Sequence, residues 1–240
     1  MTTSPKGRLF VIPSTLGLVP VDAVIPRRTL EIARGLGHFV AETPKAARRF
    51  IKEINSALSL QAIDIAELSE HTPAAAVEGL LGPALHGNDL GLLSDAGCPG
   101  VADPGAMLVA AAHRADVPVV PLPGSSAIVL ALMASGLNGQ SFCFHGYLPV
   151  KPGARTSAIK SLDETISRTA ATQIFIETPY RNEAMVNAVL SACRASTQFC
   201  VAADLNLDSE QIICRTIAAW RKAPRPALSK RPAVFLLGRG

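Results

Sequence analysis

Short apolar segments with strand character alternate with segments of helical spacing along the first half of the chain, and this alternation constrains the fold most. The predicted strands lie at residues 9–12, 38–42, 63–68, 90–93 and 117–122, and the predicted helices at 26–33, 44–54, 72–86 and 104–115. Strands that alternate with helices form parallel sheets whose faces the helices cover. We therefore predict an α/β fold.

A second series of the same kind follows Gly139. The predicted helix at 125–135 leads into it through residues 136–139. Its predicted strands lie at residues 142–144, 173–177, 199–203, 211–215 and 234–237, and its further predicted helices at 152–166 and 182–192. The last two strands are expected to pair with each other in antiparallel orientation. The sequence therefore predicts two α/β domains, residues 1–124 and 125–240, the first of them built on a largely parallel sheet.

Composition identifies a globular chain and limits its function. Hydrophobic residues make up 48% of the 240 residues and charged residues 18%, which is typical of folded proteins. The net charge of +4 permits binding to nucleic acid without arguing for it. An aromatic content of 5% argues against a surface that stacks successive RNA bases.

The spacing of cysteine and histidine predicts no metal site. The five cysteines include no Cys-x-x-Cys pair, and the histidines are dispersed. Such an odd, scattered set of thiols is typical of a reduced, cytoplasmic protein.

Pro13 and Pro20 interrupt the first apolar run, so we expect no signal peptide. The apolar run from Ala127 to Leu137 is too short to span a membrane, and no membrane association is predicted.

The loops that follow the predicted strands carry the residues expected to bind a ligand. The longest of them, residues 94–105, contains three glycines, two prolines and two aspartates. Loops at the carboxyl ends of parallel strands frame a ligand crevice, and glycines let a ligand approach the main chain. Dinucleotide-binding, phosphate-loop and serine-hydrolase signatures are absent. Cys98 has no histidine near it in sequence, so a passive role is favoured over that of a nucleophile.

Two of these loops resemble the tetrapyrrole methylase superfamily. They are Leu-Ser-Asp-Ala-Gly-Cys-Pro-Gly-Val-Ala-Asp-Pro-Gly at 93–105 and Val-Pro-Leu-Pro-Gly-Ser-Ser-Ala at 120–127. Residues 144–151 and 176–181 are also similar to the branch that contains the small-subunit ribosomal RNA cytidine 2′-O-methyltransferases. The resemblance extends over nearly the whole chain. It implies a homodimer that binds S-adenosylmethionine in a cleft between two α/β domains.

The resemblance and the chemistry of the loops together indicate which residues would bind this cofactor. Asp95 could accept hydrogen bonds from the cofactor's amino group or ribose hydroxyls, and Ser126 and Ala127 would present backbone N–H groups at a helix start. The full predicted set is Pro13, Leu93, Ser94, Asp95, Gly97, Cys98, Ser125, Ser126, Ala127, Glu177, Thr178, Leu205 and Ala233.

The predicted reaction is methyl transfer to a ribose 2′-hydroxyl of ribosomal RNA. The partner would be either the free RNA or the small ribosomal subunit. The alternatives are methylation of a small, tetrapyrrole-like molecule and cofactor binding without catalysis. A ribose hydroxyl needs a proton acceptor. Glu42 and Glu177 are favoured because both follow strands, although a capping or structural role is equally compatible with their positions; Asp103 and His145 are also chemically able.

The chain departs from the ribosomal branch at three loops. Residues 12–18 read Ile-Pro-Ser-Thr-Leu-Gly-Leu where the branch has Ala-Thr-Pro-Ile-Gly-Asn-Leu, and residues 41–45 read Ala-Glu-Thr-Pro-Lys instead of Ala-Glu-Asp-Thr-Arg. Residues 203–207 lack both basic residues of Arg-Glu-Leu-Thr-Lys. A basic rim that contacts phosphate could consist of Lys45, Arg48, Arg49, Lys151, Arg155, Lys160 and Arg181. The spacing of those on 45–52 favours a solvated helix face.

Overall fold

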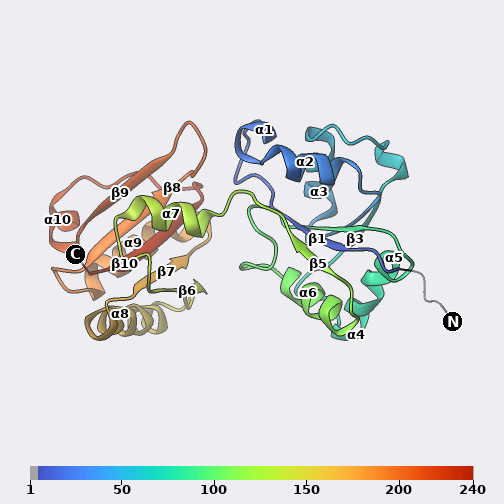
Figure 1. The fold of residues 1–240 in the computed structure, drawn as a ribbon. Helices are drawn as coiled ribbons and strands as arrows, with labels where there is room; N and C mark the ends of the chain where they lie inside the picture. Colours follow the sequence, from blue (N-terminus) through green and yellow to red (C-terminus); the bar gives the residue numbers. More distant parts are fainter. Residues whose placement is uncertain (1–4, 240) are drawn as a thin grey trace. The chain divides into compact units, whose positions relative to one another are not determined.

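Two five-stranded sheets organise the part of the chain that the structure describes, residues 5–239 of a computed structural model (Figure 1). The chain divides into two compact units, Met1–Ser126 and Ala127–Gly240, each with its own sheet and its own core. The predicted α/β class, with two α/β domains, is confirmed.

The sheet of the first unit is parallel throughout and has the strand order β3-β2-β4-β1-β5. Its strands are β1 (Leu9–Ile12), β2 (His38–Ala41), β3 (Asp64–Glu67), β4 (Leu90–Leu93) and β5 (Val119–Pro121). The helices are α1 (Val21–Val24), α2 (Arg27–Arg34), α3 (Pro44–Glu53), η1 (Leu60–Ala62), α4 (Ala74–Val77), η2 (Glu78–Leu81), α5 (Gly82–Leu85) and α6 (Gly105–Arg114).

Helices cover both faces of this sheet, with α2 and α3 on one face and α4, α5 and α6 on the other (Figure 1). The side chains of β1 alternate between the two cores: Phe10 and Ile12 pack with α2 and α3, whereas Leu9 packs with α4 and α6. All four residues of β4 are buried. Burial on both faces explains why the predicted strands read as apolar runs.

The prediction of one continuous helix at 72–86 is wrong. The structure divides it into α4, the 3-10 turn η2 and α5. Pro83 lacks a backbone N–H, and its ring would clash with the carbonyl of Gly79 in a regular helix. Gly79 and Gly82 add two residues of low helix propensity. Three short segments therefore cover this face of the sheet where one helix was expected.

The sheet of the second unit has the strand order β6-β7-β10-β8-β9. Its strands are β6 (Phe142–Tyr147), β7 (Thr172–Ile176), β8 (Gln198–Ala203), β9 (Gln211–Thr216) and β10 (Ala233–Gly238). The helices are α7 (Ala127–Ser135), α8 (Pro152–Thr169), η3 (Pro179–Arg181), α9 (Asn182–Ala192) and α10 (Ile217–Lys222).

The strand-pairing prediction for this unit is wrong. Its sheet is largely antiparallel, because only β6 and β7 pair in parallel. The last two strands, β9 and β10, are antiparallel to β8 and not to each other, since β8 lies between them. β10 therefore occupies the centre of the sheet, and all six of its residues are buried.

The core of the second unit is rich in aromatic side chains. Helices α8, α9 and α10 cover one face of the sheet, and α7 packs against β8, β9 and β10. The rings of Phe199 and Trp220 have centroids 5.6 Å apart, as do those of Phe175 and Phe235. Trp220 is fully buried, and its Nε1–H donates to the carbonyl of Phe199 at 2.7 Å. The indole thus joins α10 to β8.

An ion pair between a buried carboxylate, Asp163, and the half-exposed Arg194 is expected to make this unit sensitive to acid. Asp163 of α8 accepts hydrogen bonds from Arg194 Nε at 2.7 Å and from the hydroxyl of Thr197. Burial alone would raise the pKa of Asp163, but these hydrogen bonds outweigh it and lower the pKa below its ordinary value. A lowered folded-state pKa contributes stability that is present above the unfolded-state pKa and is lost as the pH falls through the folded-state value.

We therefore expect Asp163→Asn to flatten the loss of stability in acid. In urea unfolding of the wild type, the free energy of unfolding should fall as the pH drops below about 4, the ordinary pKa of aspartate. The variant should be less stable at neutral pH and show a smaller fall over that interval. Asp208→Asn, at an exposed position of the same unit, serves as the control. An acid dependence equal to that of the wild type would contradict the assignment.

Candidate functional site

The loops that follow β1 and β4 are joined at the carboxyl edge of the first sheet. The N–H of Ser14 donates to the carbonyl of Gly97 at 2.9 Å, and its hydroxyl donates to the carbonyl of Ser94 at 3.1 Å. The Ser94 hydroxyl donates to the carbonyl of Gly97 at 2.9 Å. Ser94, predicted to bind the cofactor, is buried and organises this loop. Leu93, also predicted, is buried in the core at the end of β4.

Asp95 is exposed at the same edge. Its Oδ2 accepts a hydrogen bond of 2.7 Å from the hydroxyl of Thr43, the second residue after β2. The loops after two neighbouring strands, β2 and β4, therefore meet at this carboxylate. An exposed carboxylate that is oriented by a neighbouring hydroxyl can accept hydrogen bonds from a ligand's ammonium or hydroxyl groups.

Pro13, Gly97, Cys98 and Ser125 form one cluster beside Asp95. The thiol of Cys98 donates to the carbonyl of Ser125 at 3.4 Å, and burial raises the pKa of this thiol. A Cβ atom on Gly124 would lie 2.6 Å from Pro13 Cβ, so Pro13 packs directly against the loop after β5. The predicted residues of the first unit are thus brought together. Ala127 begins α7, so Ser126 and Ala127 do lie at a helix start.

Gly97 has a backbone conformation that fits only glycine well, with φ +73°. A Cβ atom there would lie 3.2 Å from Leu16 Cδ2 and 3.7 Å from the carbonyl oxygen of Ser125. We expect Gly97→Ala to destabilise the first unit by about 1–2 kcal/mol in urea unfolding, the cost of the left-handed conformation. Gly79→Ala is the matched control, because no atom lies within 4 Å of that Cβ and no positive φ is required. Equal stability of the two variants would refute this prediction.

Glu42 belongs to an acidic group at this edge. Burial raises the pKa of Glu42, and the neighbouring carboxylates Asp95, Asp103 and Glu70 raise it further. A raised pKa makes the ionised Glu42 carboxylate a stronger proton acceptor. Asp103 is held within its own loop, where Oδ1 accepts from the N–H groups of Gly100 at 2.5 Å and Gly105 at 2.8 Å.

Glu177 follows β7 in the second unit, and its side chain is fully buried. Oε1 accepts from the N–H of Thr178 at 2.6 Å and from Arg181 Nη2 at 2.5 Å. Oε2 has no hydrogen-bond partner among the described residues. Burial alone would raise the pKa of Glu177, but the hydrogen bonds from Arg181 and Thr178 and the charge of Arg181 together outweigh it, and the pKa is lowered. Of the two predicted proton acceptors, Glu42 is therefore the stronger base.

The remaining predicted residues lie near Glu177 at one edge of the second sheet. Ala233 begins β10 and is paired with Ala203, the last residue of β8, while Val234 is paired with Ile176. Leu205 follows β8 and is buried. Glu177, Thr178, Leu205 and Ala233 thus gather at this edge of the second unit. The predicted cleft between the two domains stays a prediction.

Sequence comparison gives the chain named relatives. No family model matches it. The ribosomal RNA small subunit methyltransferase I of Micromonospora olivasterospora is 37% identical over 210 residues, 87% of this chain and 62% of that protein. The protein of the same name from Streptococcus pyogenes serotype M6 is 37% identical over 204 residues, 83% of this chain and 65% of that protein.

Solved structures with similar folds are also methyltransferases. The methyltransferase CobJ has a TM-score of 0.65 at 16% identity, covering 98% of this chain and 95% of CobJ. The uroporphyrin-III C-methyl transferase from Thermus thermophilus, complexed with S-adenyl homocysteine, has a TM-score of 0.58 at 15% identity and covers 97% of each chain. The chain is a homologue of the ribosomal RNA methyltransferases and has the tetrapyrrole methylase fold. The resemblance inferred from its loops is confirmed.

This methyltransferase homologue spans between 57% and 65% of the length of the curated relatives it matches. Among residues 5–239, no group of three or more His, Cys, Asp or Glu side chains could hold a metal ion. No helix in the same range combines the length and the apolar character that a membrane crossing requires.

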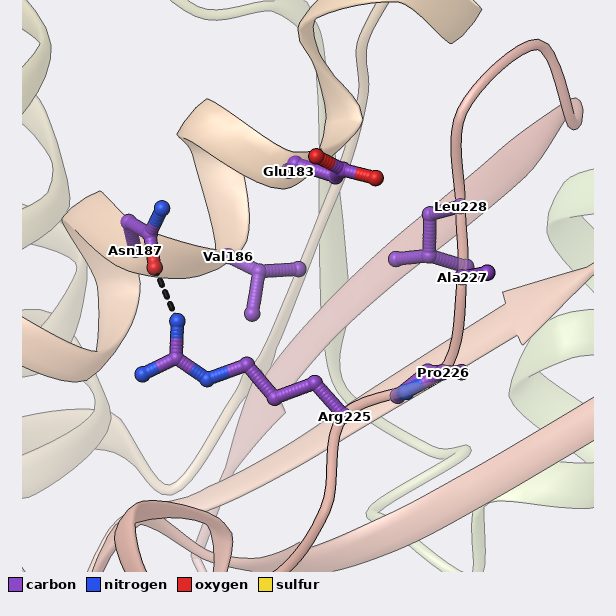
Figure 2. A pocket seen from close by; sticks show the side chains of 7 residues that line it. All are labelled: Glu183, Val186, Asn187, Arg225, Pro226, Ala227 and Leu228. Atoms are coloured by element: carbon purple, nitrogen blue, oxygen red, sulfur yellow. Dashed lines mark hydrogen bonds between the residues drawn. The ribbon is translucent and has the colours of Figure 1, made fainter.

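Two cavities lie away from the predicted residues. One, of 300 Å³, lies between α9 and the segment before β10, with Glu183 and Arg225 on different sides of an apolar floor formed by Val186 and Leu228 (Figure 2). Arg225 donates to the side-chain oxygen of Asn187. The other, of 490 Å³, is lined by residues 18–22, Arg34, Glu53 and Asn55. Neither contains a residue of the predicted cofactor site.

Two residues of the predicted basic rim are not free on the surface. Arg155 is buried, and Arg181 is paired with Glu177. Lys45 and Arg48, in contrast, are exposed on α3. The pairing of Arg181 with Glu177 was missed by sequence reasoning. Its signal is the spacing of four residues between opposite charges, which here spans a 3-10 turn instead of an α-helix.

Proposed function

We propose that the chain is an S-adenosylmethionine-dependent methyltransferase that acts on small-subunit ribosomal RNA. The observation that carries the proposal is the 37% identity, over 87% of the chain, to a protein named ribosomal RNA small subunit methyltransferase I. The geometry of the Asp95 loop supports it. A solved protein of the same fold is complexed with S-adenyl homocysteine, the demethylated form of the cofactor.

The residues at the carboxyl edge of the first sheet fit this cofactor. Asp95 offers an exposed carboxylate that the hydroxyl of Thr43 orients. In the second unit, Glu177 Oε2 is a buried acceptor without a partner among the described residues. Such an acceptor suits a ligand that brings a hydrogen-bond donor. When bound, S-adenosylmethionine supplies a methyl group on a positively charged sulfonium.

Glu42 is the residue that we propose as proton acceptor for the ribose hydroxyl. Its raised pKa makes the carboxylate a stronger base than Glu177, whose charge Arg181 stabilises. The exposed Lys45 and Arg48 on α3 suit contacts with RNA phosphates. The role proposed for Glu177 is cofactor orientation, since its carboxylate is buried and fixed.

The test is transfer of a labelled methyl group from S-adenosylmethionine to isolated small ribosomal subunits, to naked ribosomal RNA and to tetrapyrroles. Labelling of a ribose in either RNA substrate, reduced in Glu42→Gln, is the expected result. Labelling of tetrapyrroles alone would overturn the RNA proposal. Calorimetric binding of S-adenosylmethionine without transfer to any substrate would overturn the enzymatic proposal.

A homodimer is proposed on the same resemblance. Size-exclusion chromatography with light scattering should then give twice the mass of the 25.1 kDa chain. A mass of one chain, at the protein concentration used in the transfer assay, would contradict the dimer.

A further inference from the structure

A cysteine, a histidine and a glutamine lie together on the outer strand of the second sheet. β6 is the edge strand, and Cys143 is paired with Gln173 of β7. Cys143 and His145 are two residues apart in β6, so their side chains share one face. Cys143 Sγ lies 4.0 Å from His145 Nδ1, and His145 Nε2 lies 2.8 Å from Gln173 Oε1. Cys143 is exposed, whereas Gln173 is only 1% exposed.

Hydrogen bonding around Gln173 determines which histidine nitrogen carries the proton. Gln173 Nε2 donates to the carbonyl of Ala171 at 2.8 Å, so its Oε1 is directed toward His145. An amide oxygen only accepts, so Nε2 of His145 must carry the hydrogen. In the neutral imidazole, Nδ1 then has a lone pair directed toward the thiol of Cys143. His145 is thereby oriented as the proton acceptor for this thiol.

We propose that Cys143 is a thiol modification site that forms mixed disulfides with low-molecular-weight disulfides. His145 is its base, and Gln173 is the positioning residue. Nucleophile, base and orienting group are within hydrogen-bond reach of one another, as covalent chemistry at sulfur requires. The thiol proton passes to His145 Nδ1, and Sγ bonds to one sulfur of the disulfide. The S–S bond of the disulfide breaks, and the departing thiolate takes the proton from His145. The products are a mixed disulfide on Cys143 and one free thiol.

The other four cysteines are less suited to this reaction. Cys193 is buried, and burial raises its pKa to about 12. Cys200 is fully buried, and Cys98 is half-buried with a raised pKa. Cys214 is the competitor, because the hydrogen bond from its cross-strand partner Cys200 lowers its pKa. Cys214 is half-buried, however, and the hydrogen bond that lowers its pKa comes from Cys200, not from a histidine.

The test uses an aromatic disulfide, 5,5′-dithiobis(2-nitrobenzoate), on the folded protein, and mass spectrometry to locate the modified cysteine. Cys143→Ser should remove the fastest phase of thiol release. His145→Gln should slow that phase by about tenfold, the value of one hydrogen bond of ordinary strength. Cys214→Ser, and His113→Gln at an exposed histidine of α6, should leave its rate unchanged.

Three outcomes on the folded protein would overturn the proposal. They are a fast phase that survives in Cys143→Ser, a fast phase that disappears in Cys214→Ser, and equal rates for wild type and His145→Gln. In denaturant, where the folded arrangement is lost, wild type and His145→Gln should react at the same rate. A rate difference that persists there would likewise contradict the role of His145. The outcome is independent of cofactor binding and methyl transfer.

Discussion

Replacing Asp95 with asparagine is expected to weaken the binding of S-adenosylmethionine by about tenfold to a hundredfold. The carboxylate is exposed at the edge of the first sheet, and its Oδ2 already accepts the Thr43 hydroxyl. A hydrogen bond to a charged acceptor contributes about 1.5–3 kcal/mol, and an amide that replaces it loses the charge and one acceptor oxygen. Titration calorimetry with the cofactor and with its demethylated form measures the loss directly.

Asp116→Asn is the matched control for this variant. Asp116 is an exposed aspartate of the same unit, between α6 and β5, at the opposite end of the strands from Asp95. Its φ of +49° is tolerated by asparagine, so the substitution removes the same charge with little strain. Wild-type affinity in Asp95→Asn, or equal losses in the two variants, would contradict a specific contact at Asp95.

The gathering of the candidate residues in the first unit could be predicted because it follows from parallel strand pairing. Once β1, β2, β4 and β5 are recognised as parallel, their carboxyl ends must meet at one edge of the sheet. Asp95 and Gly97 were predicted by this argument, and their loop does contact the loops that follow β1 and β2. The contact between Asp95 and Thr43 could not be predicted, because it depends on β2 and β4 being neighbours in the sheet.

The errors have equally specific causes. Apolar periodicity does not state which strands are neighbours, so β9 and β10 were paired with each other although β8 separates them. Local breakers were given too little weight at Gly82 and Pro83, where the predicted helix is divided. Helix α10 was missed because it is one short segment, although Thr216 is a helix-capping residue whose side chain accepts from the N–H of Ala219.

Charged residues were the hardest to assign from sequence. Arg155 and Arg181 were placed on a surface rim, yet one is buried and the other is paired with a buried carboxylate. A sequence gives the spacing of arginines but not their burial, which depends on packing against other elements. The same limitation applies to Cys143 and His145: their spacing places them on one strand face, but only the strand pairing brings Gln173 to them.

Trp220→Ala is expected to have the largest effect on stability, about 3–5 kcal/mol for the second unit. The indole is fully buried, its ring packs on Phe199, and its N–H donates to the carbonyl of Phe199. The truncation leaves a cavity and removes that hydrogen bond at once. A typical domain is stable by about 5–15 kcal/mol, so this loss is a large share of the total. Trp220→Phe, which keeps a ring but lacks the donor, should lose less.

The measurement can separate the two units because Trp220 is the single tryptophan of the chain. In the wild type, tryptophan fluorescence during urea unfolding reports on the second unit, whereas far-ultraviolet circular dichroism reports on both. Trp220→Ala removes the fluorescence signal, so its unfolding must be followed by circular dichroism. The circular-dichroism unfolding midpoint that coincides with the wild-type fluorescence midpoint should move to a lower urea concentration in Trp220→Ala. At urea concentrations where this variant stays folded, its binding of S-adenosylmethionine should still depend on Asp95. An unchanged midpoint would mean that the packing of α10 on β8 contributes little to the second core.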